Sequence, residues 1–226
     1  MRAWFARARG LRSLCVGLAG LAMCLHAQAG AQREEVLTDA VRSALAAAIG
    51  QALPPEPVHT SSQHAQAFAH WLASMQPRLQ QHLQRRAART ANGPAHELDS
   101  VELQREFLQT VWYESQRAGL EASLVLGLVE VESGFRKFAI SSAGARGYMQ
   151  VMPFWSRLLT GGDASELFHA QANLRYGCVI LRHYLDLEGG DLTLALGRYN
   201  GSRGQLAYPN AVRAAQKKWA LPESPR

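Results

Sequence analysis

The chain has 226 residues, 47% of them hydrophobic, and carries a formal net charge of +6 at pH 7. This apolar content is enough to bury a core, which excludes an intrinsically disordered chain and favours one domain with an appendage. Four of the positive charges belong to an N-terminal leader, and removing them lowers +6 to +2, which leaves little of the basic field typical of nucleic-acid-binding proteins.

Residues 1–31 have the features of a cleavable secretory signal peptide. An apolar run over residues 14–25 is followed by small residues that allow cleavage after Ala29 or Ala31, and it is preceded by Arg2, Arg7, Arg9 and Arg12. The run is too short for a permanent membrane-spanning helix. Because Met23 rather than a small residue precedes Cys24, we expect simple secretion and rank an outer-membrane lipoprotein below it.

Without the leader, the chain keeps one cysteine, Cys178, which therefore has no partner for an internal disulfide. A lone cysteine beside apolar residues is typical of a small core residue rather than a nucleophile. The eight histidines are scattered, without a His-Glu-x-x-His motif or a Cys-His cluster. The sequence therefore predicts no metal site and no cofactor.

Residues 32–99 are predicted to form a helical N-terminal arm. A helix over 34–52 should end at the proline-rich segment 54–57, and a second helix over 61–92 should break near Pro77. The Asn-Gly-Pro turn at 92–94 marks the expected boundary of the next domain.

Residues 100–219 are predicted to form the main domain, with a C-terminal tail over 220–226. Apolar residues recur there at helical spacing, and no stretch shows sustained alternation with a period of two. The fold class is therefore mainly α, with helices expected over 101–119, 120–132, 172–187, 193–199 and 211–219.

Glu132 ends the second of these helices and is its most informative residue. Val125, Leu128 and Val129 lie seven, four and three residues before it, so all four side chains share one apolar face. Burial raises the pKa of a carboxyl group and keeps it protonated near neutral pH, ready to donate a proton. The alternative is a structural acid paired with an arginine such as Arg136 or Arg146, and position alone does not decide between the two.

Four sequence blocks follow in a fixed order: Glu-Ser-Gly-Phe at 132–135, Ser141 with Gly-Ala-Arg-Gly-Tyr-Met-Gln-Val-Met-Pro at 144–153, Asn-Leu-Arg-Tyr-Gly at 173–177, and Tyr-Asn-Gly at 199–201. Together they resemble the soluble lytic transglycosylase (SLT) domain, a lysozyme-like family that cleaves peptidoglycan. The resemblance covers roughly residues 101–219. It implies a lysozyme-like helical domain of the goose-type/SLT kind behind the helical arm, acting on peptidoglycan glycan strands in the periplasm.

The resemblance also implies the chemistry and the site. Glu132 would protonate the glycosidic oxygen between N-acetylmuramic acid and N-acetylglucosamine, and would then act as base on the C6 hydroxyl, leaving a 1,6-anhydro end. Ser141 would contact sugar substituents, Gln150 and Met152 would line the groove, and Tyr199, with Asn200 beside it, would reach toward Glu132. Taken singly, such residues are more often loop caps or core residues.

Two other functions remain open from the sequence. One is a lysozyme-type hydrolase on the same fold, in which water attacks the sugar. The other is a non-catalytic glycan-binding or scaffold protein that uses residues 32–99 to hold a partner in a cell-wall or secretion assembly. Tyr148, Trp155 and Tyr184 are aromatic candidates either for stacking on sugars or for core packing. The sequence leaves the oligomeric state open.

Overall fold

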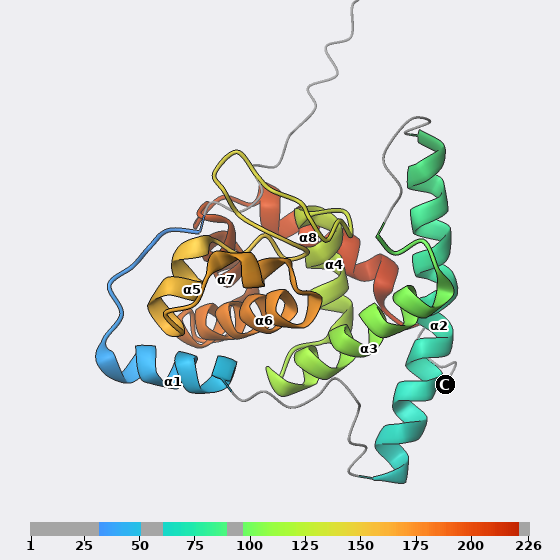
Figure 1. The fold of residues 1–226 in the computed structure, drawn as a ribbon, viewed down its shortest axis with the longest axis horizontal. Helices are drawn as coiled ribbons and strands as arrows, with labels where there is room; N and C mark the ends of the chain where they lie inside the picture. The colour runs from blue at the N-terminus through green and yellow to red at the C-terminus, as the bar shows by residue number, and fades with distance from the viewer. Residues whose placement is uncertain (1–31, 51–60, 90–96, 222–226) are drawn as a thin grey trace, which may run out of the picture.

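A computed structural model describes residues 32–50, 61–89 and 97–221, so the predicted signal peptide, the proline-rich segment 54–57 and the turn at 92–94 lie outside the described residues. Helices dominate the described part of the chain (Figure 1), which confirms the prediction of a mainly α fold. The helices are, in chain order, α1 (Asp39–Gly50), α2 (Ser62–Arg89), α3 (Val101–Arg117), α4 (Ala122–Glu132), α5 (Pro153–Leu159), the 3-10 helix η1 (Ala164–Phe168), α6 (Ala170–Leu187), α7 (Leu192–Asn200) and α8 (Ala207–Trp219).

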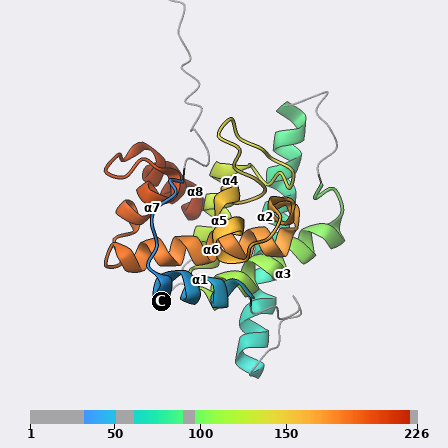
Figure 2. The same ribbon diagram turned by 60° about the vertical axis from the view of Figure 1, so that its left-hand side comes forward.

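The helices surround α4, which rises through the middle of the molecule and is crossed by α8 (Figure 1). α6 lies beside α1, α3 and α7, and the long α2 stands along the outer side of α3 in both views (Figures 1 and 2). Gly127 allows α8 to approach α4 closely, because a Cβ atom there would lie 2.6 Å from the backbone nitrogen of Gln216. The middle of α4 is therefore packed closely against α8.

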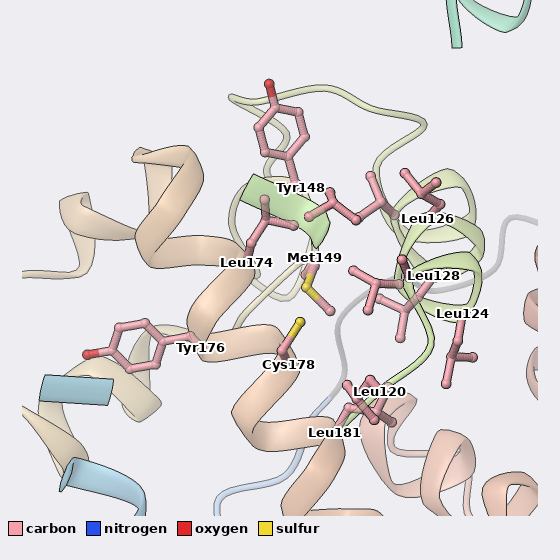
Figure 3. Packing of buried hydrophobic residues seen from close by; sticks show 14 of the residues in the cluster. Leu120, Leu124, Leu126, Leu128, Tyr148, Met149, Leu174, Tyr176, Cys178 and Leu181 are labelled. Atoms are coloured by element: carbon pink, nitrogen blue, oxygen red, sulfur yellow. The ribbon is translucent and has the colours of Figure 1, made fainter. Parts of the chain in front are cut away.

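The core forms around the apolar faces of α4 and α6. Leu128 of α4, Met149 and Leu174 pack together between α4 and α6, and Cys178 points toward Met149 (Figure 3). Cys178 is fully buried, and burial raises the pKa of its thiol well above the ordinary value. Its predicted place as a small core residue is therefore confirmed.

The two helices before residue 97 share this core. Trp71 of α2 packs against Trp112 of α3 with ring centroids 5.0 Å apart, and Leu45 and Ile49 of α1 are buried in the same cluster. Arg78 of α2 also donates to the carbonyl oxygen of Ala220 at 2.7 Å. The predicted arm is thus helical, and its inner faces are part of the hydrophobic core.

The helices differ from the prediction at three places, each with a physical reason. α2 continues through Pro77, where a break was expected. A proline removes one hydrogen bond, but the packing of the apolar side of α2 on the core compensates for that loss. α5, which begins at Pro153, was not predicted, although proline favours the first turn of a helix. α8 begins four residues before the expected Ala211, and this brings Tyr208 into its first turn.

Candidate active site

Glu132 is the last residue of α4, and its carboxyl group is buried with only 5% of the residue exposed. The hydroxyl of Tyr208, from the first turn of α8, donates to Oε1 of Glu132 at 2.5 Å. The other oxygen, Oε2, is buried and has no hydrogen-bond partner among the described residues. The carboxyl group is therefore held at one oxygen and left available at the other.

Burial raises the pKa of Glu132 from 4.5 to about 8, and the hydrogen bond from Tyr208 opposes part of this rise. No other acid within the described ranges contributes to the shift. The arginine pairing considered from the sequence is absent here: Nε of Arg136 donates to the Ser133 carbonyl at 3.0 Å, and the Arg146 guanidinium lies 5.5 Å from the ring centroid of Phe168. At neutral pH the group is mainly protonated and can act as a proton donor.

The tyrosine that bonds Glu132 is not the expected one. Tyr199 was expected to reach Glu132, but its hydroxyl donates to the Met149 carbonyl at 2.8 Å because its fully buried ring directs it there. Tyr199 still lies within the electrostatic reach of Glu132, whose negative charge is the second cause, after burial, that raises the pKa of the tyrosine. Tyr208 was missed because the last helix was predicted to begin at Ala211. The signal was Pro209, which is tolerated in a first turn.

The loop between α4 and α5 carries most of the other predicted residues, and Gln150 fastens it. The side-chain Nε2 of Gln150 donates to the carbonyls of Ala139 at 3.1 Å and Gly147 at 2.9 Å, and the residue has a left-handed φ of 49°. The carboxamide therefore points into the loop, and Gln150 presents backbone atoms rather than its side chain to the other segments around it.

Asn173 of α6 holds the same loop from outside, a role that the sequence did not reveal. Its Oδ1 accepts from the Met149 backbone nitrogen, and its Nδ2 donates to the carbonyls of Arg146 and Leu167, all at 2.8 Å. Gly147 makes this contact possible, because a Cβ atom there would lie 2.3 Å from Nδ2 of Asn173. The signal was present in the Asn-Leu-Arg-Tyr-Gly block, which was noted without a role for its asparagine.

Of the remaining predicted residues, Ser141 and Asn200 have local partners and Met152 has a distant one. The hydroxyl of Ser141 accepts from the Ala145 backbone nitrogen at 3.1 Å, the loop-capping geometry that is common for serine. Oδ1 of Asn200 accepts from the Ser202 hydroxyl at 2.9 Å. Met152 is half-buried at the start of α5, and its backbone nitrogen donates to Oε1 of a glutamine before α1, Gln32, at 3.0 Å.

The three aromatic candidates for sugar stacking are core residues. Tyr148, Trp155 and Tyr184 are each only 2% exposed, so their ring faces meet protein rather than solvent (Figure 3 shows Tyr148). Of the two alternatives, sugar stacking and core packing, the structure supports core packing for all three.

Within the described ranges, no group of three or more histidine, cysteine or acidic side chains is placed to hold a metal ion. A search of the same residues finds no helix that is long and apolar enough to cross a membrane.

Comparison with known proteins places this site in context. The family model described as "Transglycosylase SLT domain" matches residues 109–222. Proteins called membrane-bound lytic murein transglycosylase C are similar to the chain: the one from Actinobacillus pleuropneumoniae is 49% identical over 113 residues, which cover 49% of this chain and 29% of that protein. The one from Mannheimia succiniciproducens is 37% identical over 97 residues, covering 39% of this chain and 25% of that protein.

The chain therefore spans less than a third of the length of these relatives. Among solved structures, an inactive variant of the lytic transglycosylase Slt from Pseudomonas aeruginosa matches with a TM-score of 0.41 and 22% identity, over 54% of this chain and 24% of that one.

Proposed function

Because the chain belongs to the transglycosylase SLT domain family, we propose that it is a peptidoglycan lytic transglycosylase in which Glu132 acts first as acid and then as base. The observation that carries this proposal is the state of Glu132. Its carboxyl group is buried, is bonded by one tyrosine, and has a pKa raised to about 8 by burial. A group with these properties holds a proton at neutral pH and can release it to a leaving oxygen.

In the first step, Glu132 donates its proton to the glycosidic oxygen that joins N-acetylmuramic acid to N-acetylglucosamine. The bond from the muramic acid C1 to that oxygen breaks, and positive charge develops on the muramic acid ring. The carboxylate left on Glu132 is stabilised by the hydroxyl of Tyr208, which donates to Oε1. Charge-assisted hydrogen bonds of this kind are stronger than neutral ones.

In the second step, the Glu132 carboxylate takes the proton of the muramic acid C6 hydroxyl as that oxygen attacks C1 of the same sugar. The product is a 1,6-anhydro end, Glu132 regains its proton, and no water is consumed. The nucleophile is held near its target by the sugar ring, so proximity replaces part of what a second carboxylate would supply.

A lysozyme-type hydrolase is the alternative on the same fold, with water in place of the C6 hydroxyl. Glycosidases that use two carboxyl groups place them about 5 Å apart when retaining and roughly 6.5 to 9.5 Å apart when inverting. No second acid of the described residues influences the pKa of Glu132. This supports the internal nucleophile over the two-carboxylate routes.

The test is to digest purified sacculi with the secreted chain and to weigh the released muropeptides. The proposal predicts products lighter by one water than the hydrolysed ones, and it predicts no release by Glu132→Gln. Hydrated products would support the hydrolase instead. Failure of the folded wild type to release any product would favour the non-catalytic glycan-binding protein.

We also propose that the chain works in the periplasm, where its substrate lies, after removal of residues 1–31. The relatives are named membrane-bound, so attachment through lipidated Cys24 is the alternative to simple secretion. The intact mass of the protein recovered from the envelope separates the two, because lipidation keeps Cys24 as the first residue and adds the mass of acyl chains. A protein partner bound through residues 32–99 would have to use the outward faces of α1 and α2, since their inner faces are part of the core.

A further inference from the structure

Gln32 is a buried polar residue that the proposed mechanism does not use. Only 4% of it is exposed, and its carboxamide makes two hydrogen bonds to backbone far away in the sequence. Nε2 donates to the Gln150 carbonyl at 3.2 Å, and Oε1 accepts from the Met152 backbone nitrogen at 3.0 Å. A glutamine is rarely buried this deeply unless such partners hold it there.

Gln32 lies beside Tyr199, whose pKa is influenced by the proposed acid. Gln32 also hydrogen-bonds the side chain of Tyr199, where the bond opposes the rise in the tyrosine pKa that burial and the charge of Glu132 cause. Tyr199 therefore has Gln32 on one side and lies within electrostatic reach of Glu132. The backbone that Gln32 occupies, residues 150–152, is the segment expected to line the sugar groove.

Most of the segment that carries Gln32 is exposed. It runs from the start of α1 past α7 without regular structure (Figures 1 and 2), and residues 33–36 are exposed between the buried Gln32 and Leu37, which packs against the core. An ion pair joins Glu35 to Arg198 at 3.0 Å, and ion pairs at the surface contribute little to stability. Exposed segments without regular structure can open locally while the rest of the protein stays folded.

The occupied backbone offers one acceptor and one donor, the Gln150 carbonyl and the Met152 N–H. An N-acetylated sugar carries the matching groups, since its acetamido carbonyl accepts a hydrogen bond and its neighbouring N–H or hydroxyl groups donate one. We propose that Gln32 occupies this part of the expected sugar groove, and that a glycan strand must displace residues 32–35 before its N-acetylated sugars can bind there. The inference rests on the proposed function and makes residue 32 an intramolecular competitor of the substrate.

The test compares Gln32→Ala with Arg33→Ala, a neighbouring change at an exposed residue of the same segment. Chitotetraose binding is measured by titration calorimetry, and the apparent KM by muropeptide release from sacculi. Gln32→Ala leaves the Gln150 carbonyl and the Met152 N–H unoccupied. We therefore expect about fivefold tighter chitotetraose binding and about fivefold lower KM for this variant. The kcat should stay within twofold, and Arg33→Ala should match the wild type in all three quantities.

A purely structural role for Gln32 predicts a different pattern. In that case, Gln32→Ala would lower the unfolding midpoint while sugar binding and KM stay unchanged or become weaker, and the inference would be wrong. The wild type provides a second measurement that needs no variant. Hydrogen exchange at residues 32–35 should become faster when chitotetraose is added, and unchanged or slower exchange with the sugar bound contradicts the inference.

Failure of this inference can be told from failure of the proposed function. If sacculi are cut to anhydro products while Gln32→Ala behaves like the wild type, only the role of Gln32 is lost. If the wild type neither binds chitotetraose nor releases muropeptides, both proposals are wrong.

Discussion

Two buried glutamates in this molecule have opposite surroundings. Glu114 of α3 is 1% exposed and accepts hydrogen bonds from two arginines, Nη2 of Arg175 at 2.9 Å and Nη1 of Arg117 at 3.2 Å. Glu132 of α4 is almost as deeply buried, but it accepts its hydrogen bond from the neutral hydroxyl of Tyr208. The negative charge of Glu114 is balanced by two arginines, whereas Glu132 avoids a buried negative charge by keeping its proton.

The surroundings separate an ion-paired acid from the acid that we propose to act in catalysis. Arg175 and Arg117 also donate to the carbonyls of Ile49 and Ala48, so the ion-paired region joins α3, α6 and the end of α1. Removing charge there would weaken the fold. Glu132 itself makes one hydrogen bond, to Tyr208 of α8, and its other oxygen has no partner among the described residues. Such a group is costly to ionise, and that cost is what makes it a proton donor near neutral pH.

The largest expected effect is on activity. Glu132→Gln removes the transferable proton and should lower the rate of muropeptide release from sacculi about a thousandfold or more. The matched control is Glu114→Gln, assayed at a temperature where it is folded, which should retain activity within tenfold of the wild type. Equal losses in the two variants would erase the distinction between the two acids.

The next effect is on stability, and here we expect the loss in Glu114→Gln rather than in Glu132→Gln. Glu114→Gln leaves Arg175 buried with an uncompensated charge, so the free energy of unfolding should fall by about 3 kcal/mol. Urea unfolding followed by circular dichroism measures this at pH 7. Glu132→Gln, which removes no ion pair, should not be destabilised in the same experiment.

The pH dependence of stability sharpens the comparison further. The pKa of Glu132 is about 8 in the folded chain against an ordinary value of 4.5, so between these pH values the folded state holds a proton that the unfolded state releases. The wild type must therefore lose stability relative to Glu132→Gln as pH rises through this window, by roughly 2 kcal/mol between pH 6 and pH 8. Urea titrations of both proteins at a series of pH values would show a constant difference if Glu132 were ionised throughout.

The smallest effect concerns the tyrosine partner. Tyr208→Phe removes a hydrogen bond that lowers the pKa of Glu132, so the fall in activity at alkaline pH should move to higher pH. The rate should also drop about tenfold, because the carboxylate formed in the first step loses its donor. Tyr199→Phe is the control, since its hydroxyl bonds the Met149 carbonyl, and it should leave the alkaline limb in place. If the alkaline limb moved only in Tyr199→Phe, then Tyr199 rather than Tyr208 would be the partner of Glu132.

The fold and the burial of Glu132 were predictable from local patterns. The apolar spacing before Glu132 placed it on a core-facing side of a helix, and Val125, Leu128 and Val129 are all buried. The motif blocks led to the lysozyme-like helical fold, which family membership confirms. Both predictions depend on helical periodicity and on residues near one another in the sequence.

What the sequence missed depends on contacts between distant segments. Tyr208 meets Glu132 only because α8 begins before Pro209 and crosses α4. The Gln150 side chain turns inward because the residue has a left-handed φ, and a glutamine in the sequence gives no sign of that conformation. Gln32 follows the predicted leader and precedes a polar segment, so nothing local predicts that its carboxamide reaches residues 150–152.

The most direct test of the account is a carbon-13 NMR titration of the Glu132 carboxyl group in the folded wild type, with its resonance assigned by its loss in Glu132→Gln. The account predicts a midpoint of about 8, set by burial and moderated by Tyr208. A midpoint near the ordinary value of 4.5 would mean that Glu132 is ionised at neutral pH, and would contradict its assignment as the proton donor.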